Sequence, residues 1–559
     1  ERIVEMTRAK FLWTGVLIVL LLSSSLTFAA KEPPARRVID PQVYRAMQYA
    51  FPYTDENAPV KPGPTRAAED QQLGISTPSA SPGGVIGLTW YDFQHNGRVG
   101  RMNETRTGTS TLAHFTWMHL YGRDPQLSRG IKYDNYNISL QAFGTEVKLQ
   151  ADDQRAGYVA LDVTNDNRAV IGCHTMTIAD GLIDSWVYWD FAEGASFFGT
   201  TAMVPGAISA YAGLPNQEVI WPSIAYSEGP TDTVLHVFSQ NSLPNAGDPQ
   251  AIYYFRRVGS ESDPSAAWDN PPRVVDTVFD ISQTLEANDD GKVALVWTAN
   301  IPCSAGDPDT ASCNTGLAPV QWNNDIYYQI SDDYGATWHP RVNLTKNRQY
   351  EGTEHYKPYA DVGVLLDLTG NLHIVWNAAF WDVEETVYFR NRIFHWSENQ
   401  PYIRTAHSAD WDQTECNGGA WTTNACKMSI SECNGRLYCL FAQFNDGKAG
   451  IFNDCANEGN PGFPRGSANG DLYVTVSEDG GLTWDQARNL TNSRTPGCDS
   501  VDGAGGPCES DMWPTMARYG TDVALTPGDN VTDVVIPTGG SDNGWFLDVQ
   551  YINDHSAGG

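Results

Sequence analysis

Two stretches of this chain repeat one pattern, S-x-D-x-G-x-T-W. The copies are Ser331–Trp338 and Ser477–Trp484, and they lie 146 residues apart. Each follows a segment with strand-like alternation, and each precedes an Asn-Leu-Thr triplet, at Asn343–Thr345 and Asn489–Thr491. A strand–turn–strand unit that recurs in this way is typical of a repeat architecture. The sequence therefore predicts a fold assembled from similar β units.

The residue types of the pattern suit a tight turn. The aspartate can accept backbone N–H bonds, the glycine reaches backbone conformations closed to other residues, and the tryptophan offers an apolar ring to the next strand. We therefore assign structural roles to all ten positions: Ser331, Asp333, Gly335, Thr337, Trp338, Ser477, Asp479, Gly481, Thr483 and Trp484.

The pattern resembles the Asp-box, or BNR, repeat of sialidase-like β-propellers. The resemblance implies that each box lies in the turn between the two outer strands of a blade, away from the active face. Sialidases of that family carry an Arg-Ile-Pro motif, an arginine triad and a Tyr–Glu nucleophile pair, so the resemblance implies that these groups should be sought in this sequence. Neither Arg2-Ile3 nor Arg392-Ile393 is followed by proline, and no motif marks a triad arginine.

A second repeat sets the number of blades. Proline leads into a strand at Pro222, Pro358 and Pro514, at a spacing similar to that of the boxes. Two blades per interval correspond to about 70 residues per blade. The fold class is therefore all-β: a β-propeller of seven blades, with six as the alternative, each a four-stranded antiparallel sheet. We expect an N-terminal strand near Val85–Phe93 to complete or neighbour the final blade.

The chain divides into three predicted parts. Residues 1–30 read as a secretory signal peptide with upstream residues, since basic Arg8 and Lys10 precede the apolar run Phe11–Leu22. Residues 31–83 are a Pro/Gly-rich linker or pro-segment, and residues 84–559 form the propeller. The chain of 559 residues carries a net charge of −31, which disfavours nucleic acid and anionic membrane as partners.

Ten cysteines agree with export to an oxidising compartment. Three pairs each bracket a polar loop, which predicts the disulfides Cys303–Cys313, Cys416–Cys426 and Cys498–Cys508. The pairing of Cys433, Cys439 and Cys455 is left open, with Cys455 able to bond either of the others, and Cys173 can remain a thiol.

The candidate site residues gather on loops that enter the inner strands. Glu354, His355 and Asp382 could do acid/base chemistry if they lie close together. The candidates for ligand binding combine aromatic rings with charges, a composition that suits sugars; they are Trp221, Glu351, Tyr356, Lys357, Trp381, Asp511 and Trp513. The alternative is that the tryptophans pack between blades and the charges are only solvated.

Two function classes remain. The first is a secreted or cell-surface, monomeric propeller that binds glycan or extracellular protein ligands. The second is a divergent exo-glycosidase of sialidase-like type. No cofactor or metal-ligand motif is predicted, although acidic turns such as Asn165–Asn167 and Asn288–Gly291 have residues that can bind Ca²⁺ as well as form ordinary hairpins.

Overall fold

The structure is a computed structural model. It describes residues 81–555, with gaps at 92, 96–99, 121–128, 152–153, 177–182, 206–217, 242–249, 264–265, 270, 279, 302–322, 348–351, 385, 412–415, 417, 420, 445–453, 457–465, 499–507 and 523–544. All of these belong to one compact unit. The predicted signal peptide and most of the predicted linker lie outside the described residues. Among the described residues, no helix has the length and apolarity that a membrane span requires.

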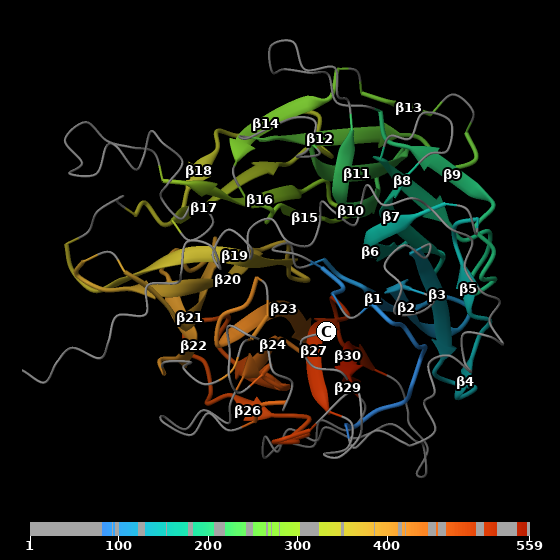
Figure 1. Cartoon of the computed structure of the whole chain (residues 1–559). Coiled ribbons are helices and arrows are strands. Elements are labelled where there is room, and N and C mark those ends of the chain that lie inside the picture. The colour runs from blue at the N-terminus through green and yellow to red at the C-terminus, as the bar shows by residue number, and fades with distance from the viewer. Residues whose placement is uncertain are drawn as a thin grey trace, which may run out of the picture. The chain divides into compact units, whose positions relative to one another are not determined.

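Antiparallel sheets follow one another around a ring in chain order (Figure 1). Blade 1 consists of β1 (Asn103–Thr107), β2 (Thr111–His119), β3 (Gly130–Asn137), β4 (Ala142–Phe143) and β5 (Val147–Lys148). Blade 2 consists of β6 (Ala156–Val163), β7 (Ala169–Met176), β8 (Ile183–Trp189) and β9 (Thr200–Met203). Blade 3 consists of β10 (Val219–Glu228), β11 (Thr233–Asn241), β12 (Gln250–Val258), β13 (Ala267–Trp268) and β14 (Arg273–Val278).

The next three sheets continue the ring. Blade 4 consists of β15 (Thr284–Ala287), β16 (Val293–Asn300), β17 (Asn324–Ser331) and β18 (Val342–Asn343). Blade 5 consists of β19 (His355–Leu366), β20 (Leu372–Trp381), β21 (Val387–Ser397) and β22 (Arg404–Ala409). Blade 6 consists of β23 (Ala425–Cys433), β24 (Arg436–Phe444), β25 (Gly470–Ser477) and β26 (Arg488–Asn489).

The seventh position in the ring holds a smaller sheet. In it β27 (Ser510–Met516) pairs with β30 (Val549–Asp554), and β27 contacts both β23 and β1. A separate ladder joins β28 (Thr521–Asp522) to β29 (Trp545–Phe546). The all-β propeller is confirmed. The six complete sheets agree with the alternative count of six blades; in place of the seventh four-stranded blade, the described residues form only a two-stranded sheet.

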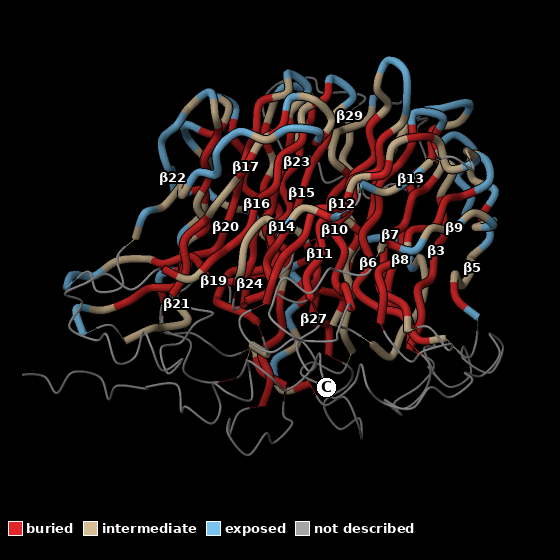
Figure 2. The backbone as a smooth tube through the Cα atoms, turned by 90° about the horizontal axis from the view of Figure 1, so that it is seen from above, coloured by how far each residue is buried: buried red, intermediate tan, exposed pale blue. Residues whose placement is uncertain are grey.

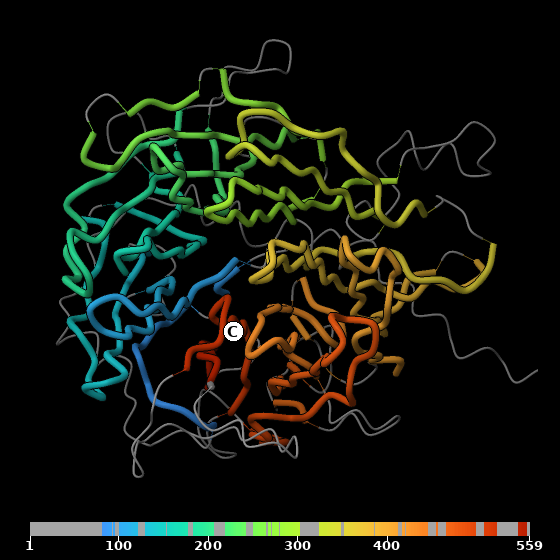
Figure 3. Tube along the Cα trace, turned by 180° about the vertical axis from the view of Figure 1, so that it is seen from behind, coloured from blue at the N-terminus to red at the C-terminus, as the bar shows by residue number. Residues whose placement is uncertain are grey.

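The first and last described segments meet beside this sheet, where blue and red segments lie together in Figure 3. The Ser81 hydroxyl donates to Asp511 (3.0 Å), and the Tyr551 hydroxyl donates to the carbonyl oxygen of Pro82. Residues 81–91 form no strand. The N-terminal segment therefore neighbours the final sheet, as expected, but does not add a strand to it.

The ring has two faces, defined here by the chain connections. The turn face carries the turns that join the first strand of a blade to the second and the third to the fourth. The loop face, at the opposite end, carries the remaining connections. Figure 2 views the ring edge-on, with buried strands in the middle and exposed turns gathered along one edge. Buried apolar side chains fill the spaces between neighbouring blades.

Both repeat turns join the third and fourth strands of a blade, at β17–β18 and β25–β26. In the first copy, Asp333 accepts the backbone N–H and the hydroxyl of Thr337 (2.8 and 2.6 Å). The Ser331 hydroxyl donates to Asp333 (2.7 Å) and accepts the N–H of Gly335 (2.9 Å). Asp479 makes the same bonds in the second copy. These aspartates therefore act within their own turns.

The tryptophan of each repeat turn also packs against the preceding blade. The Trp338 ring meets Tyr254 at 4.8 Å, and the Trp484 ring meets His395 at 5.2 Å. Gly335 has a φ of +78°, and a Cβ there would lie 1.8 Å from the Tyr254 hydroxyl. Glycine is required for both the backbone conformation and the close approach. The repeated turn therefore serves to pack one blade against the preceding one.

A related turn, which the sequence pattern did not reveal, joins the third and fourth strands of blade 2. Asp190 accepts the N–H groups of Ser196 (3.1 Å) and Phe197 (3.0 Å), and Gly194 has a φ of +61°. Phe198 packs on Tyr133 of the preceding blade at 5.0 Å. The aspartate here stands at the start of the turn instead of its third position, so the S-x-D pattern does not match.

Under the three turns lies a matching set of buried pairs, one in every second blade. They are His114 with Tyr133 (2.7 Å), His236 with Tyr254 (2.7 Å) and His373 with His395 (3.0 Å). Burial lowers the pKa of His114 to about 4 and that of His236 to about 3. The imidazoles of His114 and His236 are therefore neutral core groups. Because the three pairs recur in every second blade, the unit that repeats is a pair of blades.

Hydrogen bonds also join successive blades along the turn face. In blade order the partners are Asn165 with Glu228, Glu228 with Asp289, Lys292 with Gly370, Leu368 with Glu432, and Glu432 with Arg518. The acidic turns at Asn165–Asn167 and Asn288–Gly291 thus bind each other, which is a structural use of residues that could also hold Ca²⁺.

Replacing Gly335 by alanine tests the packing role of the turn. We expect Gly335→Ala to lower the free energy of unfolding by about 2–4 kcal/mol, since a strained backbone and a clash add together. Gly435→Ala is the matched control, because Gly435 has a φ of +73° and open space around its Cβ position. It should cost only about 1 kcal/mol. Urea denaturation measures both; equal losses would contradict the packing role.

Candidate functional site

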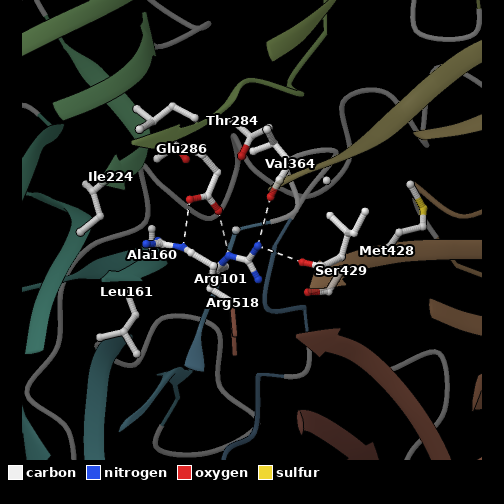
Figure 4. Close-up of a pocket in the computed structure, with 15 residues that line it drawn as sticks. Arg101, Ala160, Leu161, Ile224, Thr284, Glu286, Val364, Met428, Ser429 and Arg518 are labelled. Atoms are coloured by element: carbon white, nitrogen blue, oxygen red, sulfur yellow. Dashed lines mark hydrogen bonds and ion pairs between the residues drawn. The ribbon is translucent and has the colours of Figure 1, made fainter. Parts of the chain in front are cut away.

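Two arginines fill the centre of the ring (Figure 4). Arg101, just before β1, binds Glu286 of β15 through Nε (2.9 Å). Its other nitrogens donate to the carbonyl oxygens of Met516 (3.0 Å), Val364 (3.1 Å) and Ile430 (2.9 Å). A single guanidinium thus joins the inner strands of four other sheets.

Arg518 lies beside Arg101, with Glu286 between the two guanidinium groups (Figure 4). It binds Glu286 at 3.0 Å and Asp162 at 3.3 Å, and its backbone N–H donates to Glu104 (2.9 Å). Burial raises the pKa of Glu104 to about 6, although both arginines act to lower it. Because protein groups already bind these charges, we interpret the cluster as a closure of the channel and not as a ligand site.

The loop end of blade 5 brings most of the predicted site residues together. His355 and Trp381 pair across β19 and β20, and their rings stack at 6.2 Å with an interplanar angle of 15°. The Lys357 ammonium lies over the Trp381 ring at 4.5 Å. The long strands of this blade, 12 residues in β19 and 11 in β21, position these side chains.

The loop end of blade 5 also carries a tyrosine, an aspartate and an arginine that are partly exposed and contact one another. The Tyr356 hydroxyl donates to Asp410 at 2.5 Å. Arg392 binds the other carboxylate oxygen of Asp410 at 2.8 Å and lies over the Tyr356 ring at 4.5 Å. Burial, and then the negative charge of Asp410, raise the pKa of Tyr356 above its ordinary value. The phenol is therefore protonated and held in place.

A second group extends the surface along β21. The Arg390 guanidinium lies 3.6 Å from the Phe380 ring centroid and 5.0 Å from that of Tyr388. The Tyr388 hydroxyl donates to Asp382 at 2.9 Å. We name this surface the blade-5 rim; its residues are Tyr356, Phe380, Asp382, Tyr388, Arg390, Arg392 and Asp410. His355, Lys357 and Trp381 lie on the opposite face of the same sheet, because neighbouring residues of a strand point to opposite faces.

Of the three catalytic candidates, Asp382 and His355 hydrogen-bond backbone groups close by in the chain. Asp382 accepts the backbone N–H groups of Glu384 and Thr386, both at 2.9 Å, and so caps its own hairpin turn. Glu354 is exposed, and the His355 ring bonds the carbonyl oxygen of Thr353 (2.6 Å). A catalytic role for this trio stays a prediction.

The other binding candidates lie apart from the rim. Trp221 begins the bulge of β10 with a φ of +54° and packs against Tyr158 at 6.3 Å. Trp513 has the equivalent place in β27, with a φ of +59°, and packs against Phe93 at 4.6 Å. Both are buried, as is Asp511. Glu351 lies outside the described residues.

Sequence reasoning missed Asp410, Arg390, Arg392 and Tyr388. Asp410 follows β22, so only the pairing of β21 with β22 brings its side chain within reach of Arg392. Arg390 and Arg392 did carry a signal, because alternate residues of a strand share a face. No group of three or more His, Cys, Asp or Glu side chains able to hold a metal occurs within the described residues.

The disulfides differ in part from expectation. Cys498–Cys508 is confirmed, whereas Cys416 bonds Cys455 and not Cys426. Cys426 lies inside β23 and is buried as a thiol, like Cys173 and Cys439. Cys416 and Cys455 belong to one buried cluster with the strands of blade 6, and their Cα atoms lie 5.9 Å apart. The open question of the Cys455 partner is thereby answered, and Cys433 and Cys439 are both thiols. Cys303 and Cys313 lie outside the described residues.

Comparison with known proteins identifies no family: no family model and no curated protein matches this chain. Among solved structures, an α-L-arabinanase from Penicillium chrysogenum in complex with arabinobiose is 10% identical, with a TM-score of 0.34 over 71% of this chain and 93% of that one. A Trypanosoma rangeli sialidase in complex with sialic acid is 10% identical, with a TM-score of 0.36 over 69% of this chain. This chain spans 55% of that sialidase. The propeller assignment rests on the sheets described above.

The raised pKa of Glu104 predicts a pH dependence of stability. A carboxyl whose pKa is raised from 4.5 to about 6 on folding stabilises the fold fully below pH 4.5 and loses that contribution as pH rises through 6. Between pH 4 and 7, wild type should therefore lose about 2 kcal/mol relative to Glu104→Gln, which does not titrate. Urea denaturation across this range measures the difference; a constant difference would contradict the assignment.

Proposed function

We propose that this protein binds glycan or extracellular protein ligands through the blade-5 rim. The observation that supports the proposal most directly is the partly exposed Tyr356–Asp410–Arg392 arrangement, in which an aromatic ring, a carboxylate and a guanidinium are held together by their own hydrogen bonds. Such a surface is ordered before a ligand arrives, which lowers the entropy cost of binding.

The composition of the rim favours a sugar as the ligand. Aromatic rings offer flat apolar faces, and the polar groups around them can bond hydroxyl groups in fixed directions. Asp410 supplies acceptor oxygens, and Arg392 supplies donors. Tyr388, which is half-buried, adds a further ring beside Arg390, whereas Phe380 is buried beneath that arginine.

An extracellular location fits this function. Two disulfides are present in the described residues, and disulfides persist in oxidising compartments. The charge of −31 suits a soluble protein that avoids nucleic acid and anionic membranes. We propose that the secreted form acts as a monomer.

Removing the Tyr356 ring tests the binding proposal. We expect Tyr356→Ala to weaken glycan binding at least about tenfold, since an aromatic contact at the centre of a site contributes more than 1 kcal/mol. Glycan arrays identify the ligand, and calorimetry measures its affinity.

Tyr402→Ala is the matched control. Tyr402 also lies under an arginine, with Arg404 5.3 Å from its ring centroid, but in the turn between β21 and β22 at the other end of the blade. Its loss should leave binding unchanged. Equal effects of the two variants, or none from Tyr356→Ala, would count against the rim as the binding surface.

A divergent exo-glycosidase is the second candidate, and the 2.5 Å contact between Tyr356 and Asp410 is the observation that favours it. A carboxylate beside a tyrosine can take the phenolic proton during attack on a sugar, as in glycosidases that use a Tyr nucleophile. The raised pKa of Tyr356 opposes this role in the unbound protein.

A panel of glycosides distinguishes binding from hydrolysis. We expect the wild type to release no sugar and Tyr356→Phe, which removes only the hydroxyl, to keep most of its affinity. Release that falls at least about 100-fold in both Tyr356→Phe and Asp410→Asn would establish hydrolysis instead. Glu354→Gln and Asp382→Asn extend the panel, because a loss of release in either would place the catalytic group there.

A further inference from the structure

The blade-5 rim contains two clusters of the same chemistry, each a tyrosine whose hydroxyl is bound to an aspartate. Tyr356 of β19 donates its hydroxyl to Asp410 Oδ1 (2.5 Å). Tyr388 of β21 donates its hydroxyl to Asp382 Oδ2 (2.9 Å). All four residues are half-buried or exposed. The rim therefore presents a ring with a carboxylate at its polar end in two places.

The two clusters are adjacent, with Phe380 of β20 between them. Phe380 pairs with Tyr356 across β19 and β20, and with Tyr388 across β20 and β21. Its ring centroid lies 5.4 Å from that of Tyr356 and 5.7 Å from that of Tyr388. Two strand spacings, about 10 Å, separate the backbones of the two tyrosines. A single sugar ring, which is similar in width to a phenyl ring, covers only one cluster.

The hydrogen bonds inside each cluster determine what it can offer a ligand. A tyrosine hydroxyl that gives its proton to a carboxylate can only accept further bonds, and an ionised carboxylate also only accepts. Arg390 and Arg392, which lie over the tyrosine rings at 5.0 and 4.5 Å, carry donors only. A ligand that bonds both kinds of group has to donate and accept at neighbouring positions. Hydroxyl groups do both.

The charges of the rim favour an uncharged ligand. Asp382 and Asp410 balance Arg390 and Arg392 in number, and Arg392 binds Asp410 directly at 2.8 Å. Glu384, exposed in the same turn as Asp382, adds a further negative charge. A carboxylate or sulfate on the ligand would face the acceptors of both clusters, and like charges placed together are unfavourable.

We propose that the blade-5 rim holds two adjacent subsites and that its ligand is a neutral oligosaccharide of at least two sugar units. This inference rests on the proposed function, because it specifies the ligand of the same surface. Tyr356 with Asp410 forms one subsite, and Tyr388 with Asp382 forms the other. Asp382 is held in place for this role, since its Oδ1 accepts the backbone N–H groups of Glu384 and Thr386.

Two linked subsites make affinity depend on chain length. Once one sugar unit is bound, the next unit reaches the second subsite at a high effective concentration. We expect the disaccharide or trisaccharide of the preferred series to bind at least about tenfold more tightly than its monosaccharide, and longer chains to add little.

A glycan array with neutral and acidic glycans of one to six sugar units identifies the preferred series, and calorimetry measures the affinity of each member. We expect neutral oligosaccharides to bind most tightly. Tyr388→Ala should weaken their binding about tenfold and remove most of the gain with chain length. Tyr388→Phe keeps the ring and removes only the hydroxyl, so it should give a smaller loss, and it serves if Tyr388→Ala fails to fold.

Tyr402→Ala is again the matched control and should keep the full dependence on chain length. The inference is overturned, with the rim still a binding surface, if acidic glycans bind more tightly or a monosaccharide binds as tightly as its oligomers. It is also overturned if Tyr356→Ala weakens binding and the Tyr388 variants do not. Absence of glycan binding overturns it and leaves a protein as the ligand. Loss of affinity in neither Tyr356→Ala nor Tyr388→Ala overturns the proposed function itself.

Discussion

The ion network of Arg101, Glu286 and Arg518 is the interaction on which the ring depends. The inner strand of each blade presents backbone carbonyl groups to the channel, and a guanidinium has enough donors to bind several of them at once. Arg101 bonds three such carbonyl oxygens, from β19, β23 and the last residue of β27. Because Arg101 and Arg518 come from opposite ends of the propeller sequence, their shared carboxylate, Glu286, holds the first and last sheets together.

The ion network at the centre of the ring also limits which surfaces of the ring are available to bind a ligand. Charges bound to one another occupy the centre of the ring, and hydrogen-bonded hairpin turns join blades along the turn face. The loop end of blade 5 is different, since its long strands carry partly exposed rings and charges away from the core. Rigid strands are better supports for a binding surface than loops are, because packing locks the side chains that they present. Tyr356, Arg392 and Asp410 have that support from β19, β21 and β22.

Much of the fold could be predicted because its signals are local. The bonds of Asp333 and Asp479 stay within five residues, so the turn pattern reports its own structure. The blade-2 turn was missed because Asp190 makes similar bonds from another position. The site was only half predicted: Tyr356 stands out by residue type near a turn, whereas Asp410 becomes its neighbour only through strand pairing. The Cys416–Cys455 disulfide was missed for the same reason, since sequence proximity favoured Cys426.

The sequence by itself determined the all-β class, the repeated turn and the approximate blade length, because hydrophobic alternation and turn chemistry act over a few residues. Only the tertiary structure decided how the ring closes, which thiols pair and which carboxylate Tyr356 contacts. It also decided that Trp221 and Trp513 enter the core. These outcomes depend on contacts between residues far apart in the chain, and residue type alone does not encode which distant partner a side chain will meet.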